Sequence, residues 1–301
     1  MRAILVKDGK GPAENLYLGE APDPVPQAGQ VVVKIKSFAL NRMDILQREG
    51  HYPVPPGAST LLGVEFSGNI SAVADDVKGW KLDDEVFGLT GGVAYQAIVM
   101  YGEVAEGDNV LIHAAASGVG IAAIQLARSK GAKTVIATAS TKDKLDWLLS
   151  IPNGATHVVN YKTQDFAREV ATITEGKGAN VVVDFVGQSH WKKNIESLAL
   201  DGRMVMLGTL SGTMVSEFDL KALLYKRLRI QGTTLRSRSV EYQSDLIQRF
   251  KSEFLAGLTG QAGDGPLKTY IHKVYSWKDI QTAHRDMEQS ANIGKLLVEI
   301  D

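Results

Sequence analysis

The sequence predicts an α/β protein with a doubly wound parallel sheet in the middle of the chain and a β-rich part before it. From residue 109 onward, short apolar runs alternate with segments of helical periodicity, a pattern typical of parallel strands joined by crossover helices. The first ninety residues instead contain short strand-like runs separated by prolines and glycines, which predicts an all-β module. The stretch from residue 238 onward mixes helical and strand-like segments.

The clearest local unit lies at residues 109–131. Val110-Leu111-Ile112 suits a buried parallel strand, small residues follow at 114–120, and apolar residues then recur at helical spacing. A turn of small residues lets the backbone approach a pyrophosphate, and the helix N-terminus offers free N–H groups and a positive dipole end. We therefore expect a dinucleotide phosphate site at Ser117, Gly118, Val119 and Gly120.

The glycine pattern of this turn is incomplete. Aligned on G-x-G-x-x-G, its three positions hold Ala115, Ser117 and Gly120, so only the glycine that allows close helix–strand packing is present. Alone, the segment would also fit a tight turn in any α/β protein. The alternation that follows favours the dinucleotide site, since further apolar runs lie at 134–138, 158–160, 181–183 and 204–208.

The end of the second strand indicates which dinucleotide binds. An NAD site usually places Asp or Glu there to hold the ribose hydroxyls, whereas residues 137–140 contain no acid. Ser140, Thr141 and Lys144 offer hydroxyls and one cation to a 2′-phosphate, and Tyr161 offers a phenol hydroxyl. Alone, Lys144 would also suit a solvated helix position. The missing carboxylate favours NADPH as the cofactor.

The composition excludes several function classes. The 301 residues contain no cysteine, which rules out disulfides, thiolate chemistry and cysteine-based zinc sites. Lys and Arg total 33 against 34 for Asp and Glu, a net charge of −1 that gives no basic field for nucleic acid. The six histidines lack metal spacing. With no apolar run long enough for a membrane span and early charges at the N-terminus, we expect a cytoplasmic protein.

Five short motifs together keep the order and spacing of one known family. They are Ala39-Leu40-Asn41-Arg42-x-Asp44 with Gln47 and Tyr52; Leu62-Gly63-Val64-Glu65-Phe66-Ser67-Gly68; His113-Ala-Ala-x-Ser117-Gly118-Val119-Gly120; Thr233-Thr-Leu235-Arg236-Ser-Arg238; and Asn292-Ile-Gly294-Lys295. The set resembles the zinc-free quinone oxidoreductases of the medium-chain dehydrogenase/reductase superfamily, the zeta-crystallin-like branch. The resemblance implies a central Rossmann domain, a GroES-like β domain from both termini, NADPH-dependent quinone reduction, and homodimers or homotetramers.

This resemblance divides the chain into three segments. Residues 1–93 would form the first part of the GroES-like substrate domain, 94–237 the Rossmann NADPH-binding domain, and 238–301 the return segment of the GroES-like domain. It also implies further cofactor-binding residues, namely Gly187, Gly208, Thr209, Leu235 and Asn292.

A mechanism without metal follows from the residues present. Zinc-dependent relatives carry a cysteine near Asn41 and a histidine at Val64, so no metal site is expected. A quinone suits hydride transfer without a Lewis acid, because its reduced oxyanion is delocalised. Asn41, Gln47 and Tyr52 are candidates to position its oxygen, and Asp44 completes the candidate catalytic set. Asn41 and Asp44 would also suit capping of a helix at 42–48.

One departure from the family is large. After Gly88-Leu-Thr-Gly-Gly92 the family continues with a strand, a proline-containing connection and a helix, whereas here Val93 leads directly into Ala94-Tyr95-Gln96. About thirty residues, enough for one strand and one helix, are missing. Val93 also replaces the usual threonine beside the nicotinamide. We expect a bare strand edge and weakened substrate binding at this place.

The function therefore has three interpretations. The leading one is an NADPH-dependent quinone reductase whose activity is impaired by the missing segment. The second is a reductase of enones or small aldehydes, since the same hydride geometry serves them. The third is a non-catalytic NADPH-binding protein, because part of the active-site wall is absent.

Overall fold

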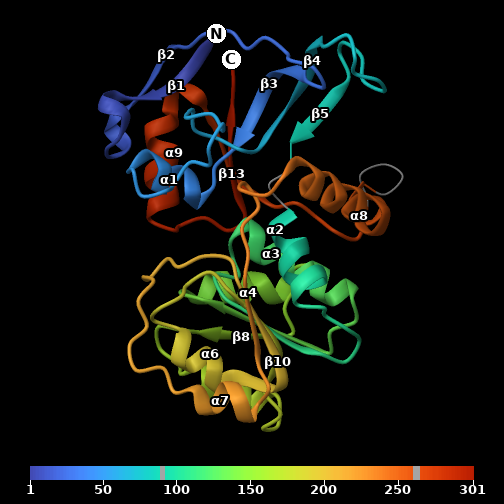
Figure 1. Ribbon diagram of the computed structural model, residues 1–301. Coiled ribbons are helices and arrows are strands. Elements are labelled where there is room, and N and C mark those ends of the chain that lie inside the picture. Colours follow the sequence, from blue (N-terminus) through green and yellow to red (C-terminus); the bar gives the residue numbers. More distant parts are fainter. Residues whose placement is uncertain (89–91, 260–264) are drawn as a thin grey trace. The chain divides into compact units, whose positions relative to one another are not determined.

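The computed structural model describes residues 1–88, 92–259 and 265–301 (Figure 1). Contacts divide the chain into two compact units, Met1–Thr90 with Tyr270–Asp301, and Gly91–Thr269. The second unit contains a six-stranded sheet, and the first contains a five-stranded and a two-stranded sheet. The predicted α/β fold class is thereby confirmed.

The six-stranded sheet is parallel at every pairing of its strands. In spatial order the strands are β11 (Arg229–Gly232), β10 (Leu198–Met206), β9 (Ala179–Asp184), β6 (Asn109–Ile112), β7 (Thr134–Ala139) and β8 (His157–Asn160). Within this sheet the chain first forms β6, then β7 and β8 on one side of it, and then β9, β10 and β11 on the other side. This is the doubly wound Rossmann order, in which ligands bind at the carboxyl ends of the strands where the direction reverses.

Helices connect these strands as crossover elements, namely α3 (Gly118–Ser129), α4 (Lys142–Ser150), α5 (Phe166–Ile173), α6 (Trp191–Ser197) and α7 (Leu220–Tyr225). Before β6 lie α2 (Gly92–Tyr95) and a π-helical turn at Gln96–Tyr101, and α8 (Val240–Thr259) follows β11. Phe166 of α5 and Ile195 of α6 pack on the strand residues Leu111 and Val182 in one buried cluster. The strands read as continuous apolar runs because both faces of a parallel sheet are covered.

The other unit combines both ends of the chain, as the resemblance implied (Figure 1). Its five strands lie in the order β12 (Ile271–Ser276), β13 (Lys295–Glu299), β3 (Val31–Ala39), β4 (Phe66–Val73) and β5 (Glu85–Gly88), beside the hairpin of β1 (Arg2–Val6) and β2 (Leu16–Glu20). Helices α1 (Arg42–Arg48) and α9 (Ile280–Glu288) complete it. Leu16, Ile45, Trp277 and Leu296 belong to its core.

The contacts assign residues 238–269 to the unit with the parallel sheet, whereas the predicted boundary returned the chain to the other domain at 238. The ring of Tyr95 meets Phe250 and Phe254 of α8 edge-to-face, with centroids 6.1 and 5.8 Å apart. The Tyr95 hydroxyl also donates to the Oε1 of Glu253 at 2.6 Å. These contacts hold α8 against α2, which belongs to the same unit.

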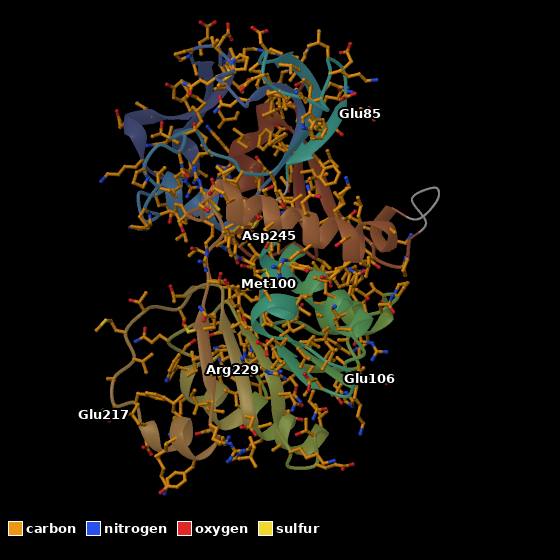
Figure 2. All side chains as sticks on the ribbon, turned by 45° about the vertical axis from the view of Figure 1, so that its right-hand side comes forward. Glu85, Met100, Glu106, Glu217, Arg229 and Asp245 are labelled. Atoms are coloured by element: carbon orange, nitrogen blue, oxygen red, sulfur yellow. The ribbon has the colours of Figure 1, made fainter. Side chains whose placement is uncertain are left out.

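Strand β5 forms one edge of the five-stranded sheet and pairs with β4. Phe87 on this strand is 59% exposed, and Glu85 points away from the unit into solvent (Figure 2). An exposed apolar side chain on an open edge is what we expected beside the shortened segment. Residues 89–91 of that junction lie outside the described residues, and the chain continues with α2 at Gly92.

Candidate functional site

The turn between β6 and α3 is built around Gly120. A Cβ added to Gly120 would lie 2.7 Å from both the carbonyl oxygen of Ala114 and the Cα of Ala115, closer than real Cβ atoms approach such groups. The Oγ of Ser117 accepts a hydrogen bond from the Gly120 N–H at 3.0 Å and caps α3. The glycine is therefore required by packing, as its place in the glycine pattern suggested.

The start of α3 has the properties of an anion-binding site. The first N–H groups of a helix have no intrahelical partner, and the aligned peptide dipoles place partial positive charge there. The turn lies at the carboxyl end of β6, next to the point where the strand order reverses. Gly118 and Val119 form the first residues of this helix. The local geometry thus fits the pyrophosphate of a dinucleotide.

The end of β7 brings hydroxyls and a cation together. Thr141 caps α4, and its Oγ1 accepts from the Lys144 N–H at 3.5 Å. Ser140 and Lys144 are half-buried. Burial first and the charge of Lys162 second lower the pKa of Lys144. The charge of Lys162, which follows β8, thus acts on the Lys144 ammonium group in the first turn of α4, and Lys162 was missed in the sequence.

Lys162 had a weak signal in the sequence. It follows Tyr161 directly after the third strand, and its proximity to Lys144 depends on the pairing of β7 with β8. A cation one residue away from a predicted phosphate ligand is the clue that was available. A pair of like charges destabilises itself and favours an anion between its members.

A buried histidine connects the ends of three elements of this unit. His113 follows β6, its Nδ1 lies 2.9 Å from the Thr138 Oγ1, and its Nε2 lies 2.7 Å from the Asn194 Oδ1. Burial, and then the charge of His190, lower the pKa of His113 to about 3, so the ring is neutral at pH 7. Since the Oδ1 of Asn194 only accepts, the Nε2 of His113 carries the hydrogen.

The predicted cofactor residue Tyr161 is 39% exposed, and its ring contacts the ring of His190 edge-to-face.

The ends of β9 and β10 form a second set of tight turns. Asp184 is fully buried, and its carboxylate accepts from the N–H groups of Val186 at 2.8 Å and Gly187 at 3.1 Å. A Cβ on Gly187 would lie 3.0 Å from the Cα of Thr209, and a Cβ on Gly208 would lie 3.0 Å from a neighbouring carbonyl oxygen. The predicted cofactor residues Gly187, Gly208 and Thr209 therefore lie together at the carboxyl ends of β9 and β10.

The remaining two predicted cofactor residues lie elsewhere. Leu235 follows β11 and is buried. Asn292 belongs to the other unit, where its side-chain amide donates to the Gly294 carbonyl at 2.6 Å. The cofactor role of Asn292 stays a prediction.

In the unit of Met1–Thr90 and Tyr270–Asp301, which we call the GroES-like unit, Asn41 belongs to a three-residue network. Its Nδ2 donates to the Glu65 Oε2 at 2.8 Å, and its Oδ1 accepts from the Lys295 Nζ at 2.9 Å. Lys295 also donates to Glu65 and to the Leu40 carbonyl, which occupies the three hydrogens of its ammonium group. The amide of Asn41 is therefore held in one orientation. The sequence places Glu65 and Lys295 in family motifs but does not predict them as site residues.

Asp44 closes the start of α1. It is only 2% exposed, its Oδ2 accepts from the Asn41 N–H at 2.7 Å, and its Oδ1 accepts from the Gly63 N–H at 3.2 Å. Burial raises the pKa of Asp44 to about 6, although these hydrogen bonds act in the opposite direction. The capping interpretation of Asn41 and Asp44 thus describes the observed contacts. Nearby, Gln47 donates to the Thr60 carbonyl at 2.9 Å, and Tyr52 is half-buried.

Within residues 1–88, 92–259 and 265–301, no three His, Asp or Glu side chains are grouped so that they could hold a metal ion. In the same ranges no helix is both long enough and apolar enough to cross a membrane. The expectation of a metal-free site stays a prediction.

Two family profiles match the chain in succession. The profile described as "Alcohol dehydrogenase GroES-like domain" matches residues 27–129, and the one described as "Zinc-binding dehydrogenase" matches residues 118–252. The chain belongs to the medium-chain dehydrogenase/reductase superfamily. As a superfamily member it is an oxidoreductase by fold and by sequence.

Curated relatives resemble the chain over nearly its whole length. Rat quinone oxidoreductase is 26% identical over 334 aligned positions, which cover 99% of this chain and 97% of the relative. The rat "synaptic vesicle membrane protein VAT-1 homolog" is 27% identical over 343 positions, 98% of this chain and 83% of the relative. Both alignments are longer than the 301 residues of the chain, so the relatives contain residues that it lacks.

Solved structures also match the chain over nearly its whole length. Escherichia coli quinone oxidoreductase complexed with NADPH has a TM-score of 0.83 and 27% identity, covering 99% of each chain. The CurK enoyl reductase has a TM-score of 0.83 and 26% identity, covering 100% of this chain and 99% of that one. The superfamily is therefore supported by both kinds of comparison, and two reductase activities occur among the similar proteins.

Proposed function

We propose that this chain binds NADPH at the carboxyl ends of its parallel sheet and reduces a quinone without a metal. The observation that carries the proposal is the glycine turn at Gly120, combined with two neighbouring cations, Lys144 and Lys162, at the ends of the next two strands. The NADPH complex of the similar E. coli quinone oxidoreductase supports the same cofactor and substrate.

The choice of NADPH over NADH rests on charge. The last residues of β7 contain no acid that would bind ribose hydroxyls. The pKa of Lys144 is lowered by burial and then by Lys162, so the two ammonium groups repel each other. A 2′-phosphate near both would replace that repulsion by two charge-assisted contacts, with the hydroxyl of Ser140 beside them.

The bound cofactor supplies a hydride, and the residues of the chain position the acceptor. The Asn41 Nδ2 carries two hydrogens, and one of them is donated to Glu65. We assign the second to the quinone oxygen, which gains negative charge as hydride arrives. The reduced ring then takes one proton from water to give the hydroquinone.

Asp44 and Gln47 are positioning residues in this proposal. The Asp44 carboxylate accepts a hydrogen bond from the backbone N–H of Asn41 and so fixes that backbone. The Gln47 side chain donates to the Thr60 carbonyl and so fixes the loop there. Tyr52 is retained as a candidate contact to the quinone. The proposed assembly is a homodimer or homotetramer in the cytoplasm, following the family resemblance.

A second candidate, an enone reductase, is favoured by one observation. The CurK enoyl reductase matches the chain with the same TM-score as the quinone oxidoreductase, 0.83. The shortened segment between β5 and α2 favours slow turnover of any acceptor, because a less enclosed site admits water. If turnover is abolished completely, the chain is a non-catalytic NADPH-binding protein.

The experiment is a comparison of acceptors on the purified chain. The absorbance of NADPH is followed with an ortho-quinone, an enal and a simple aldehyde, each against NADH as the alternative cofactor. We expect the quinone with NADPH to be the fastest pair. Faster turnover of the enal would replace the proposal by the enone reductase, and bound NADPH without any turnover would leave a binding protein.

A further inference from the structure

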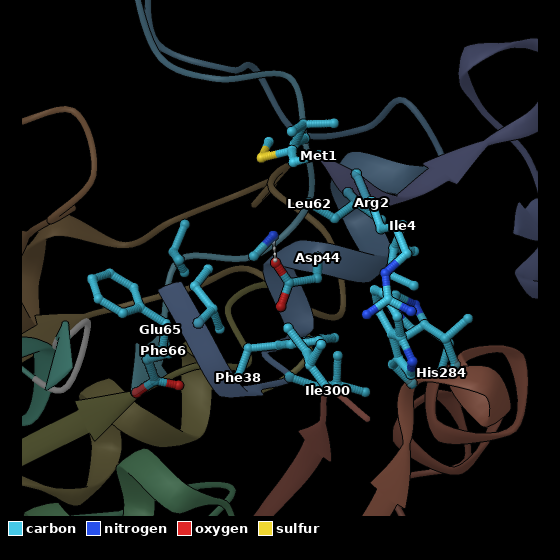
Figure 3. A pocket seen from close by; sticks show the side chains of 18 residues that line it. Met1, Arg2, Ile4, Phe38, Asp44, Leu62, Glu65, Phe66, His284 and Ile300 are labelled. Carbon is cyan, nitrogen blue, oxygen red and sulfur yellow. Dashed lines mark hydrogen bonds between the residues drawn. The ribbon is translucent and has the colours of Figure 1, made fainter. Parts of the chain in front are cut away.

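The GroES-like unit contains an apolar cavity of about 180 Å³. No step of the proposed reduction places a substrate or cofactor in it, although Asp44 in its wall also positions Asn41. Its walls come from β1, β3, α9 and the loop before β4, and they include Ile4, Phe38, Leu62 and Ile300 (Figure 3). Every lining residue belongs to the unit of Met1–Thr90 and Tyr270–Asp301. An apolar cavity of about 150 Å³ is already large enough to take up benzene.

One carboxyl group points into this cavity. Figure 3 shows Asp44 among the side chains that line it, and the Asp44 side chain is almost fully buried. Each of its oxygens accepts one backbone N–H, from Asn41 and from Gly63. A carboxylate offers about four lone-pair directions, so half of its capacity is left for a donor inside the cavity.

The other charged groups of the wall have partners of their own. Glu65 accepts from Asn41 and Lys295. Arg2 donates to the Asp301 carbonyl at 3.2 Å and lies 4.4 Å from the centre of the Trp277 ring. The hydrogen bonds of Asp44, by contrast, come from two backbone N–H groups, which are neutral donors.

A neutral imidazole completes the polar part of the wall. The Nδ1 of His284 lies 3.3 Å from the Nη1 of Arg48. A guanidinium only donates, so Nδ1 accepts and Nε2 carries the hydrogen. Burial and then the charge of Arg48 lower the pKa of His284 to about 4. The wall thus contains a carboxylate acceptor and an uncharged ring with an N–H.

We propose that this cavity is a binding site for a phenol, an aromatic ring whose hydroxyl donates to Asp44. The apolar walls and the volume fit one ring. An anionic ligand is disfavoured by the carboxylate, and an ammonium ligand by Arg2 in the wall and by the high cost of burying a charge. A neutral hydroxyl satisfies the carboxylate at the lowest desolvation cost.

The test uses phenol and anisole on the unmodified full chain. The two molecules share the ring, but the ether oxygen of anisole has no hydrogen to donate. We expect phenol to bind about tenfold tighter or more, since hydrogen bonds to a charged group reach that size. Calorimetric titration gives the two affinities, with and without NADPH. Equal affinities, or displacement of phenol by NADPH, would overturn the proposal.

Methyl-labelled isoleucine locates the site. Signals of Ile4, Ile280 and Ile300, which line the cavity, should move on addition of phenol, whereas Ile121 and Ile136 of the other unit should not. Movement confined to the other unit would contradict the assignment.

Two tryptophan variants supply the matched comparison. Leu62→Trp fills the cavity and should lower phenol affinity at least tenfold, whereas Leu82→Trp, at a 60% exposed position of the same unit, should leave it unchanged. Unchanged affinity in a folded Leu62→Trp protein would overturn the proposal. Should Leu62→Trp fail to fold, the phenol and anisole affinities of the unmodified chain decide.

Discussion

The backbone N–H of Gly120 donates to the Oγ of Ser117 at 3.0 Å, so the residue that ends the small-residue turn also caps the helix that follows it. This contact links the small-residue turn to the helix, two features that each predict little when taken alone. The small-residue turn alone fits many proteins, but a capped helix directly behind a central parallel strand is the arrangement that binds a pyrophosphate.

Gly120→Val should abolish NADPH binding. The new side chain would collide with the backbone of Ala114 and Ala115, which forces helix and strand apart and costs about 1–3 kcal/mol by overpacking. Fluorescence titration and urea unfolding measure the two effects. As a control, Gly232→Val adds its side chain where no atom lies within 4 Å. Normal NADPH binding by Gly120→Val would show that the phosphate turn lies elsewhere.

Lys144→Ala should remove most of the preference for NADPH over NADH. We expect the unmodified chain to bind NADPH at least tenfold tighter, about 1.4 kcal/mol, which one charge-assisted contact supplies. Lys162→Ala should have a similar effect, because it lies beside Lys144. Lys142→Ala is the control, since Lys142 is exposed and paired with Asp146. An unchanged preference in both test variants would count against the 2′-phosphate assignment.

Stability should fall in acid because His113 stays neutral in the folded protein. Its pKa is lowered from the ordinary 6.5 to about 3. The unfolded chain therefore takes up a proton below pH 6.5 that the folded chain refuses. The stabilisation present above pH 6.5 is lost as pH falls toward 3, by up to about 1.4 kcal/mol per pH unit.

Urea unfolding across this pH range checks the sign. His113→Gln should flatten the dependence of unfolding free energy on pH, whatever it does to stability at neutral pH. His157→Gln is the matched control, since His157 is exposed in the same unit. Equal slopes for His113→Gln and the unmodified chain would show that His113 titrates normally.

Chelation should leave any activity intact. The chain has no cysteine, and its resemblance to zinc-free reductases predicts no zinc ligand at Val64. Exhaustive dialysis against a chelator, with elemental analysis, tests this. One tightly held zinc per chain would refute the metal-free mechanism.

Restoring the shortened segment should raise quinone turnover. A family-like strand and helix inserted between Gly92 and Tyr95 would cover the open edge of β5 and the exposed ring of Phe87. Better enclosure should increase turnover at least tenfold, or about 1.4 kcal/mol of barrier. An insertion of equal length that is rich in glycine and serine serves as the control. If the unmodified chain is already as fast, the shortening has no functional consequence.

Local signals in the sequence predicted the strand–turn–helix unit well. The apolar run at 110–112 and the small residues before Gly120 need only their neighbours to form these elements. Lys162 and Asn194 were not predicted, because their contacts depend on which strands pair and in what register. Ile136 lies beside His157 in the sheet, and this pairing of β7 with β8 determines that Lys162 acts on Lys144. A strand pairing of this kind cannot be predicted from a local sequence pattern.

The boundary at 238 differed for a related reason. Val240–Thr259 reads as an amphipathic helix in either domain, and its partner is decided by the ring contacts of Tyr95, which lies about 150 residues away in the sequence. The capping of α1 was the opposite case. Asn41 and Asp44 are three residues apart, so their contact is local and could be foreseen.

The most direct test of this account is a fluorescence titration of the unmodified chain with NADPH and with NADH. We expect saturable binding of one NADPH per chain, at least tenfold tighter than NADH, or about 1.4 kcal/mol. Equal affinity for the two cofactors, or no binding of either, would contradict the assignment of the Gly120 turn and the Lys144–Lys162 pair to an NADPH site.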